Sequence, residues 1–336
     1  MLRIRQLKHL VNRLDTPLGD MERIAADVRK YCKELILFDP AKPGKQREVL
    51  DVTGKFRTIQ ERIYRRILVP QLVPSEYSYG GVPGRHIKAN AQAHMESTFA
   101  LTADISNFYP SISHVRVYKL FRGPFQCSPD VSHFLTRFCT YRHHLALGLV
   151  TSPILADRIF QPIDERIADM CAKAGLIYTR FVDDICLSGK FDLSPENAGV
   201  ARLLESIVGQ YGFEMQEAKR RSGALSDPKM TITKLRIKNG HVDVRWEYIR
   251  ELERRLEDAK QLAADADFRG PYFTSAQLRG QVDFVSWINP SRRRTLTSTF
   301  ASIDWARVHG NAAKRELVMH KKTLVRARGP GSTGAV

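Results

Sequence analysis

Apolar residues follow two different periods along this chain, and the two periods predict a protein that mixes helices and strands. Residues 3–34 show the spacing of two basic amphipathic helices. A short strand is expected at 47–52, and a helix at 56–68. From about residue 248 onward the pattern is entirely helical, with one helix ending at Asn289-Pro290. Between these regions the apolar runs are short, as expected of buried strands.

Two adjacent aspartates, Asp183 and Asp184, lie between two such runs, and a third, Asp104, ends the apolar strand expected at 99–104. Pairing of these strands would bring the three carboxylates together. Buried carboxylates repel each other and lose water, so they favour a neutralising cation. Oxygen ligands suit Mg²⁺, and three carboxylates could hold two ions as in polymerases. For the Asp-Asp dipeptide by itself, a plain surface turn is the alternative interpretation.

The charge balance indicates a polyanionic partner. Lys and Arg number 53 against 36 Asp and Glu, which gives a formal charge of +17. Nucleic acid fits this balance best, and an anionic membrane surface comes second. No apolar run approaches the roughly 18 residues of a membrane span, and no signal peptide is visible. The five cysteines are scattered without a CxxC pair, which predicts reduced thiols in the cytoplasm and neither a zinc site nor a disulfide framework.

Three further stretches carry candidate binding chemistry. The glycine-rich loop 77–86 ends in Arg85 at an expected helix start, where backbone N–H groups and a guanidinium could hold phosphate. Gly148 precedes a helix that begins with small residues, against which a flat base pair could lie. Residues 291–328 form a strongly basic helical stretch, which suits a phosphate backbone. The last segment, 329–336, is expected to be a disordered tail.

Three motifs occur in order: Asp104-Ile-x-x-Phe-Tyr-Pro-Ser-Ile, Gly148-x-x-x-Ser-Pro-x-Leu-Ala and Phe181-Val-Asp-Asp. Together they resemble the palm motifs of reverse transcriptases. The resemblance spans roughly residues 45 to 245, with a helical thumb continuing beyond it. Within that superfamily the chain is most similar to the bacterial retron reverse transcriptases, because of its compact size, Asn90-Ala-x-x-His94 and Cys139-Thr-Tyr.

The resemblance implies an α+β right-hand polymerase with fingers, a palm built on an antiparallel sheet, and a helical thumb. The implied boundaries are an N-terminal helical extension at 1–44, fingers at 45–98, palm at 99–245 (with 113–147 shared between fingers and palm helices), a basic thumb at 246–328 and the tail at 329–336.

It also implies roles for individual residues. Asp104 and Asp183 would be the main ligands of two Mg²⁺ ions, with Asp184 assisting and Ile105 in the same metal site. Lys219 would lie near the leaving pyrophosphate as part of the catalytic set. The nucleotide site would include Arg85 at the triphosphate, Tyr109 as the aromatic gate that excludes a 2′-OH, Gly148 and Phe181. The RNA-binding set would be Asn90, His94, Arg292, Arg293, Arg294, Lys314, Arg315, Lys321 and Lys322.

The implied activity is RNA-directed DNA synthesis from deoxynucleoside triphosphates. The template and primer would be a structured non-coding RNA, primed from one of its own 2′-OH groups, and the product an RNA–DNA molecule. An effector protein would act together with the enzyme in anti-phage defence. No membrane partner is expected. Two alternatives stay open: another defence-associated reverse transcriptase with a different RNA or untemplated synthesis, and a non-catalytic RNA-binding scaffold.

The sequence departs from the family pattern at three positions. Phe181 replaces the usual tyrosine, Leu147 stands where glutamine is common, and Lys234 stands where retron enzymes have glycine after Val-Thr. Alternatives for single residues also stay open. Arg85 could cap its loop, Lys219 could be an ordinary exposed lysine, and His94 could be a hydrogen-bonding core residue. The basic thumb could bind RNA or the product duplex.

Overall fold

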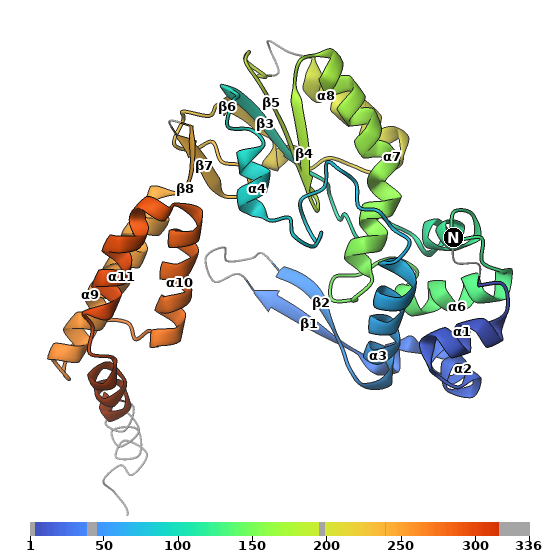
Figure 1. The fold of residues 1–336 in the computed structure, drawn as a ribbon, viewed down its shortest axis with the longest axis horizontal. Coiled ribbons are helices and arrows are strands. Elements are labelled where there is room, and N and C mark those ends of the chain that lie inside the picture. Colours follow the sequence, from blue (N-terminus) through green and yellow to red (C-terminus); the bar gives the residue numbers. More distant parts are fainter. Residues whose placement is uncertain (1–3, 39–45, 195–198, 239, 316–336) are drawn as a thin grey trace, which may run out of the picture. The chain divides into compact units, whose positions relative to one another are not determined.

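The computed structural model describes residues 4–38, 46–194, 199–238 and 240–315 (Figure 1). The chain divides into two compact units, with the boundary between Thr233 and Lys234. Both units mix helices and strands, which confirms that part of the predicted fold class. None of the described helices combines the length and apolar character needed to cross a membrane.

A four-stranded antiparallel sheet lies at the centre of the N-terminal unit, with the strand order β4-β5-β3-β6. Its strands are β3 (Phe99–Asp104), β4 (Ile177–Phe181), β5 (Asp184–Gly189) and β6 (Arg221–Ala224). β3 pairs with β5 so that Asp104 lies opposite Asp184. The expected pairing of the two acidic strand ends is therefore present in the sheet.

The long helix α7 (Ser152–Lys173) packs against β4 and against α8 (Val200–Gln210), as Figure 1 shows. Its buried side chains recur every three to four residues, which places one apolar face on the sheet. Helix α8 begins at Val200, and residues 195–198 before it lie outside the described residues.

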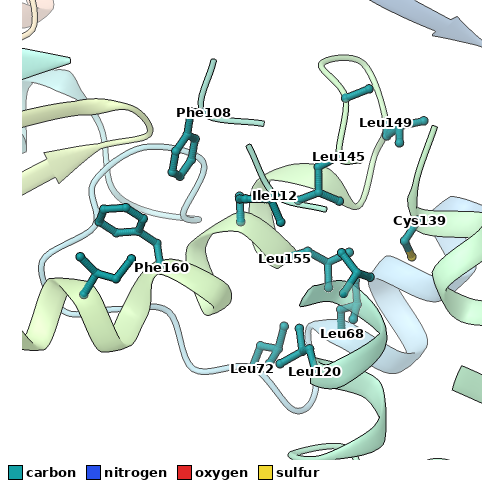
Figure 2. Close-up of a cluster of buried hydrophobic side chains, with 14 of the residues drawn as sticks. Leu68, Leu72, Phe108, Ile112, Leu120, Cys139, Leu145, Leu149, Leu155 and Phe160 are labelled. Carbon is teal, nitrogen blue, oxygen red and sulfur yellow. The ribbon is translucent and has the colours of Figure 1, made fainter. Parts of the chain in front are cut away.

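Helices α5 (His114–Arg122) and α6 (Pro129–Cys139) extend the same core away from the sheet. Figure 2 shows how the side chains between these helices and α7 meet, with Phe108, Ile112 and Leu155 among those drawn. Ile112 and Leu155 are completely buried. This core is continuous from the N-terminal helices to the sheet. The strand ends that carry the aspartates are therefore supported by a closely packed interior.

The N-terminal segment corrects one prediction. Helices α1 (Leu7–Leu14) and α2 (Leu18–Ala26) are present, but the second helix ends well before residue 34. A 3-10 turn follows, and then β1 (Cys32–Phe38), which pairs antiparallel along its whole length with β2 (Gln46–Val52). The apolar spacing at this point suits either structure, and the non-local pairing with β2 decides in favour of the strand.

The neighbouring predictions hold. β2 is the expected strand, and the expected helix at 56–68 is α3 (Gly54–Ile63), which continues as a short π-helix over Tyr64–Leu68. Helix α4 (Ile87–Gln92) begins just after Arg85, as expected.

The C-terminal unit begins with the hairpin β7 (Leu235–Lys238) and β8 (His241–Val244). Helices α9 (Trp246–Ala264), α10 (Ser275–Ile288) and α11 (Arg293–Ala301) follow, and a further helix covers 305–315. α10 starts at a capping box made by Thr274 and ends at the predicted Asn289-Pro290 boundary. The basic residues Lys321 and Lys322 and the tail at 329–336 lie outside the described residues.

Candidate active site

Three carboxylates converge where the central strands end. Asp104, Asp183 and Asp184 each offer an oxygen atom, and these atoms all lie within 4.8 Å of one another. The register of β3 against β5 sets Asp104 opposite Asp184, and the N–H of Ile105 donates to the carbonyl of Asp183 at 3.0 Å. Backbone hydrogen bonds therefore hold the cluster on rigid sheet elements. Ile105 itself is buried beside it.

The electrostatics of this cluster fit a bound cation. Burial and the charge of Asp104 raise the pKa of Asp183 above its usual value. Burial and the charge of Asp183 raise the pKa of Asp184 to about 7. Such shifts mean that the three negative charges are costly together. All the donors are carboxylate oxygens, which is the ligand type that hard divalent cations prefer.

Lys219 supplies one positive charge to this group. It lies in a 3-10 turn just before β6, and its Nζ is 2.6 Å from Oδ1 of Asp104. Its side chain is 39% exposed, so Lys219 lies at the solvent side of the cluster while it is paired with Asp104.

The turn that carries Asp183 is strained. Val182 adopts φ = 61°, a left-handed conformation that β-branched residues rarely take. Two contacts hold it. The Arg180 guanidinium donates to the Val182 carbonyl at 2.9 Å, and Gly80 lies so close that an added Cβ would be 2.6 Å from the Val182 nitrogen. Strain of this kind persists only where the surroundings fix it, and it is common at functional sites.

Arg180 is the centre of a buried network behind this turn, and its side chain is only 1% exposed. It donates to Asp164 at 2.7 and 2.8 Å and to Asp157 at 2.9 Å, while the hydroxyl of Tyr178 donates to Asp164 at 2.6 Å. Burial alone would lower the pKa of Arg180, but the Asp164 carboxylate raises it, so the guanidinium stays charged. The Cζ atom of Arg180 lies over the phenyl ring of Phe160, 4.8 Å from the ring centroid.

Sequence reasoning gave Arg180 no role. The available signal was a charged residue inside an apolar strand, since such a residue must find buried partners. Arg47 on β2 was also missed. Burial and Asp104 raise the pKa of Asp183, and the charge of Arg47 opposes a small part of that rise from a separate hairpin, for which its local sequence carries no signal.

Two predicted nucleotide-site aromatics lie around the cluster. Tyr109 is partly buried, its ring centroid is 5.6 Å from that of Phe108, and burial together with the charge of Asp183 raises its pKa to about 12. Phe181 ends β4 directly before the strained turn and is half-buried. Both residues are therefore within reach of the carboxylate cluster.

Gly148 has a structural reason to be glycine. Its φ is 101°, and a Cβ built there would meet the carbonyl oxygen of Leu50 at an impossibly short distance. The neighbouring carbonyl of Leu147 accepts from the N–H of Leu50 at 2.8 Å. The glycine therefore allows strand β2 to approach this segment.

Arg85 faces its own loop. Its Nη1 donates to the carbonyls of Ser75, Glu76 and Ser78 at distances of 2.6, 3.0 and 2.5 Å. The loop in turn pairs with β4, because the N–H of Tyr79 donates to the Arg180 carbonyl at 2.7 Å. These contacts are the ones expected if Arg85 caps its loop. The loop in turn contacts Arg180, which holds the strained turn at Val182.

Asn90 and His94 are buried, so neither presents a surface to RNA in this structure. The two ring nitrogens of His94 lie 2.6 Å from the Ser188 hydroxyl and 2.7 Å from the Thr179 hydroxyl. Asn90 donates to the hydroxyl of Thr233 at 3.5 Å. His94 thus has the position described by the core hydrogen-bonding alternative.

The predicted RNA-binding arginines and lysines of the C-terminal unit differ in their availability. Arg293, Arg294 and Lys314 are exposed. Arg292 is paired with Asp243 at 3.0 Å, and Arg315 donates to the carbonyl of Gly270 at 3.3 Å.

The profile of the reverse transcriptase (RNA-dependent DNA polymerase) family matches residues 41–239, which is more than half of the chain. The chain therefore belongs to this family, and the matched range contains the three aspartates and Lys219. The resemblance inferred from the motifs is confirmed, and with it the reverse transcriptase polymerase fold.

Among characterised relatives, the chain is similar to the retron Se72 reverse transcriptase of Salmonella heidelberg (strain 579083-10), with 31% identity over 60% of this chain and 54% of that protein. It is 27% identical to the retron Ec86 reverse transcriptase of Escherichia coli, over 77% of each chain. It is 24% identical to the retron Ec48 reverse transcriptase of the same species, over 78% of this chain and 66% of the other. The alignment thus covers about half of the Se72 protein.

Proposed function

We propose that this protein is an RNA-directed DNA polymerase of the retron type. The observation that carries the proposal is the convergence of Asp104, Asp183 and Asp184 at paired strand ends, within 4.8 Å of one another. Family membership and the similarity to several retron reverse transcriptases support it. In this proposal the sheet of the N-terminal unit is the palm and the C-terminal helices are the thumb.

Asp104 and Asp183 would hold two Mg²⁺ ions, and Asp184 would assist. When bound, the ions would lower the cost of forming a 3′-alkoxide and neutralise charge on the departing pyrophosphate. The chain itself orients the reactants. Lys219, now paired with Asp104, would interact with the pyrophosphate, and the Tyr109 ring would lie under the incoming sugar. Positioning and charge stabilisation suffice for this chemistry.

The finer parts of the proposal concern its partners. The template and primer would be a structured non-coding RNA that primes from its own 2′-OH, and an effector protein would complete a defence system. The similarity to retron reverse transcriptases supports the RNA partner. The proposed compartment is the cytoplasm, in keeping with five free cysteines.

The test of catalysis is DNA synthesis on a primed RNA template with Mg²⁺ and deoxynucleoside triphosphates. The double substitution Asp183→Asn and Asp184→Asn should abolish synthesis, because amides cannot neutralise the metal charge. Asp169→Asn, an exposed change on α7, is the matched control and should keep full activity. Undiminished synthesis by the double variant would show that the cluster is not the catalytic site.

The test of the retron type is the nucleic acid that the protein carries. Material purified after expression in its native gene neighbourhood should contain a discrete RNA joined to a complementary DNA. RNA without DNA, even after Mg²⁺ and nucleotides are added, would favour the RNA-binding scaffold instead.

A further inference from the structure

A cavity lies on the N-terminal unit, and its lining is separate from the acid cluster. Its volume is about 610 Å³, within the range of ligand sites. It is enclosed by the end of α2 and the 3-10 turn after it, by α5 and α6, and by the turn at 141–144. Helices α2 and α6 contact each other in this part of the fold. The lining includes no member of the acid cluster and no residue of the central sheet.

Cationic and aromatic side chains dominate the lining. The cationic residues are Arg29, Arg137 and Arg142, and the rings are His114, His133, His143 and Tyr118. The His114 and His143 rings lie 5.0 Å apart. Asp27 is the acidic residue of the lining and is paired with Arg29 at 2.9 Å. This combination of stacking surfaces and guanidinium groups is the kind that binds single-stranded nucleic acid.

The arginines are held in different ways. Arg137 uses Nε and Nη2 to bind the carbonyl of Ala25 at the end of α2, so its guanidinium is fixed in place. Arg142 is exposed and pairs with Glu34 at 2.7 Å. An exposed pair of this type contributes little stability, so a phosphate group can replace the carboxylate at small cost.

The turn that presents Arg142 and His143 is strained. Tyr141 and His144 exchange backbone hydrogen bonds of 2.8 and 3.1 Å across it, and the two residues between them have φ of 47° and 68°. This is the geometry of a two-residue turn that strongly prefers Asn-Gly. The backbone N–H of His114 donates to the His143 carbonyl at 2.7 Å and fixes the turn. The positive φ of Arg142 and His143 therefore lowers the stability of the turn, while both side chains line the cavity.

We propose that this cavity binds a single-stranded segment of the partner RNA, with a base stacked on the histidine rings and a phosphate on the arginines. The proposal rests on the proposed function for the identity of the partner. RNA suits the site better than a free anion, because the rings would have no part in binding phosphate alone. The site would hold the RNA apart from its reacting end.

The decisive variant replaces the turn pair with the residues that its backbone prefers, Arg142→Asn together with His143→Gly. This change removes a ring and a guanidinium while it relieves the strain. The thermal unfolding midpoint should therefore rise, while affinity for a fluorescently labelled single-stranded oligouridylate should fall about fivefold or more. The matched control is Arg57→Gln together with His9→Ala, two exposed residues outside the cavity. Unchanged affinity in the turn variant would overturn the proposal.

Photocrosslinking locates the contact independently. An oligouridylate carrying 4-thiouridine should crosslink to peptides from α5, α6 or the 141–144 turn, and the turn variant should lose these crosslinks. Crosslinks found only elsewhere would overturn the proposal. Displacement of the RNA by inorganic phosphate at constant ionic strength would identify a free-anion site and would also overturn it.

The same protein preparations are assayed for DNA synthesis on a primed template. The control variant Arg57→Gln together with His9→Ala should keep this activity, because neither residue lines the cavity or belongs to the acid cluster. Absence of synthesis in the unmodified protein would count against the proposed function alone, while RNA binding at the cavity would still be measured.

Discussion

At the scale of single residues, the catalytic turn depends on a buried charge network. Asp164 accepts three hydrogen bonds, from Tyr178 and twice from Arg180, while Arg180 also fixes the Val182 carbonyl. Removing one partner from a buried ion pair leaves an uncompensated charge, and this is more costly than losing a single neutral donor.

We expect Asp164→Asn to lower the free energy of unfolding by about 3–5 kcal/mol. Tyr178→Phe removes one hydrogen bond to the same carboxylate and should cost about 1.5–3 kcal/mol. Denaturant titrations of both variants measure the difference. Asp169→Asn, on the exposed face of the same helix, should change little. Equal losses in the Asp164 and Tyr178 variants would show that the ion pair does not dominate.

A second residue-scale prediction concerns sugar selection by Tyr109. If its ring lies under the incoming sugar, Tyr109→Ala should raise ribonucleotide incorporation by at least about tenfold relative to deoxynucleotides. Tyr109→Phe keeps the ring and should preserve discrimination. Primer extension with competing nucleotides gives both ratios, and an unaltered ratio in the alanine variant would remove Tyr109 as the gate.

At the scale of elements, local pattern and long-range contact account for different parts of the fold. The acidic strand ends were predictable, because each apolar run stops at an aspartate and the strands pair. Strand β1 was not predictable, because its apolar spacing also suits a helix. Its strand structure depends on the pairing with β2, which local sequence does not reveal. The environments of Arg85 and His94 could not be read from sequence either. His94 is fixed by partners distant along the chain, such as Ser188, and Arg85 by the way its own loop folds back onto three of its carbonyls.

His94 connects the segment after α4 to β4 and β5 through its two hydrogen bonds, and we expect the stability of the fold to fall in acid because of this residue. Burial lowers the pKa of His94 to about 4, from 6.5 for a free histidine. Between these values the unfolded chain binds a proton that the folded chain does not. The stabilisation is therefore complete above about pH 6.5 and is lost as the pH falls towards 4, by about 3 kcal/mol in all.

Denaturant titrations at several pH values measure this dependence. His94→Gln should be less stable near neutral pH but should lose less further stability on acidification. The exposed His9→Gln is the control and should follow the unmodified protein. An identical pH slope in the His94 variant would assign the effect to other groups.

The boundary between the two units carries a second strained pair. Thr233 and Lys234 have φ of 46° and 67°, in the left-handed region that favours glycine. Lys234→Gly should therefore raise the free energy of unfolding by about 0.5–1 kcal/mol. Lys238→Gly, within strand β7, should lower it by a similar amount. Thermal unfolding of both variants gives the comparison, and destabilisation by Lys234→Gly would contradict the strain argument.

At the scale of the whole molecule, the formal charge of +17 predicts that binding of nucleic acid weakens steeply with salt. Arg293 and Arg294 are exposed on the C-terminal unit, whereas Arg292 is already paired with Asp243. If each exposed arginine contacts one phosphate, the double substitution Arg293→Gln and Arg294→Gln should reduce the slope of log K against log salt by about 1.4 for single-stranded RNA. Arg292→Gln should change the slope less, because its charge is already compensated.

Titrations with RNA and with an RNA–DNA duplex show which nucleic acid these arginines bind, since only that partner's slope should fall. An unchanged slope for both would mean that the positive charge acts through other surfaces of the chain.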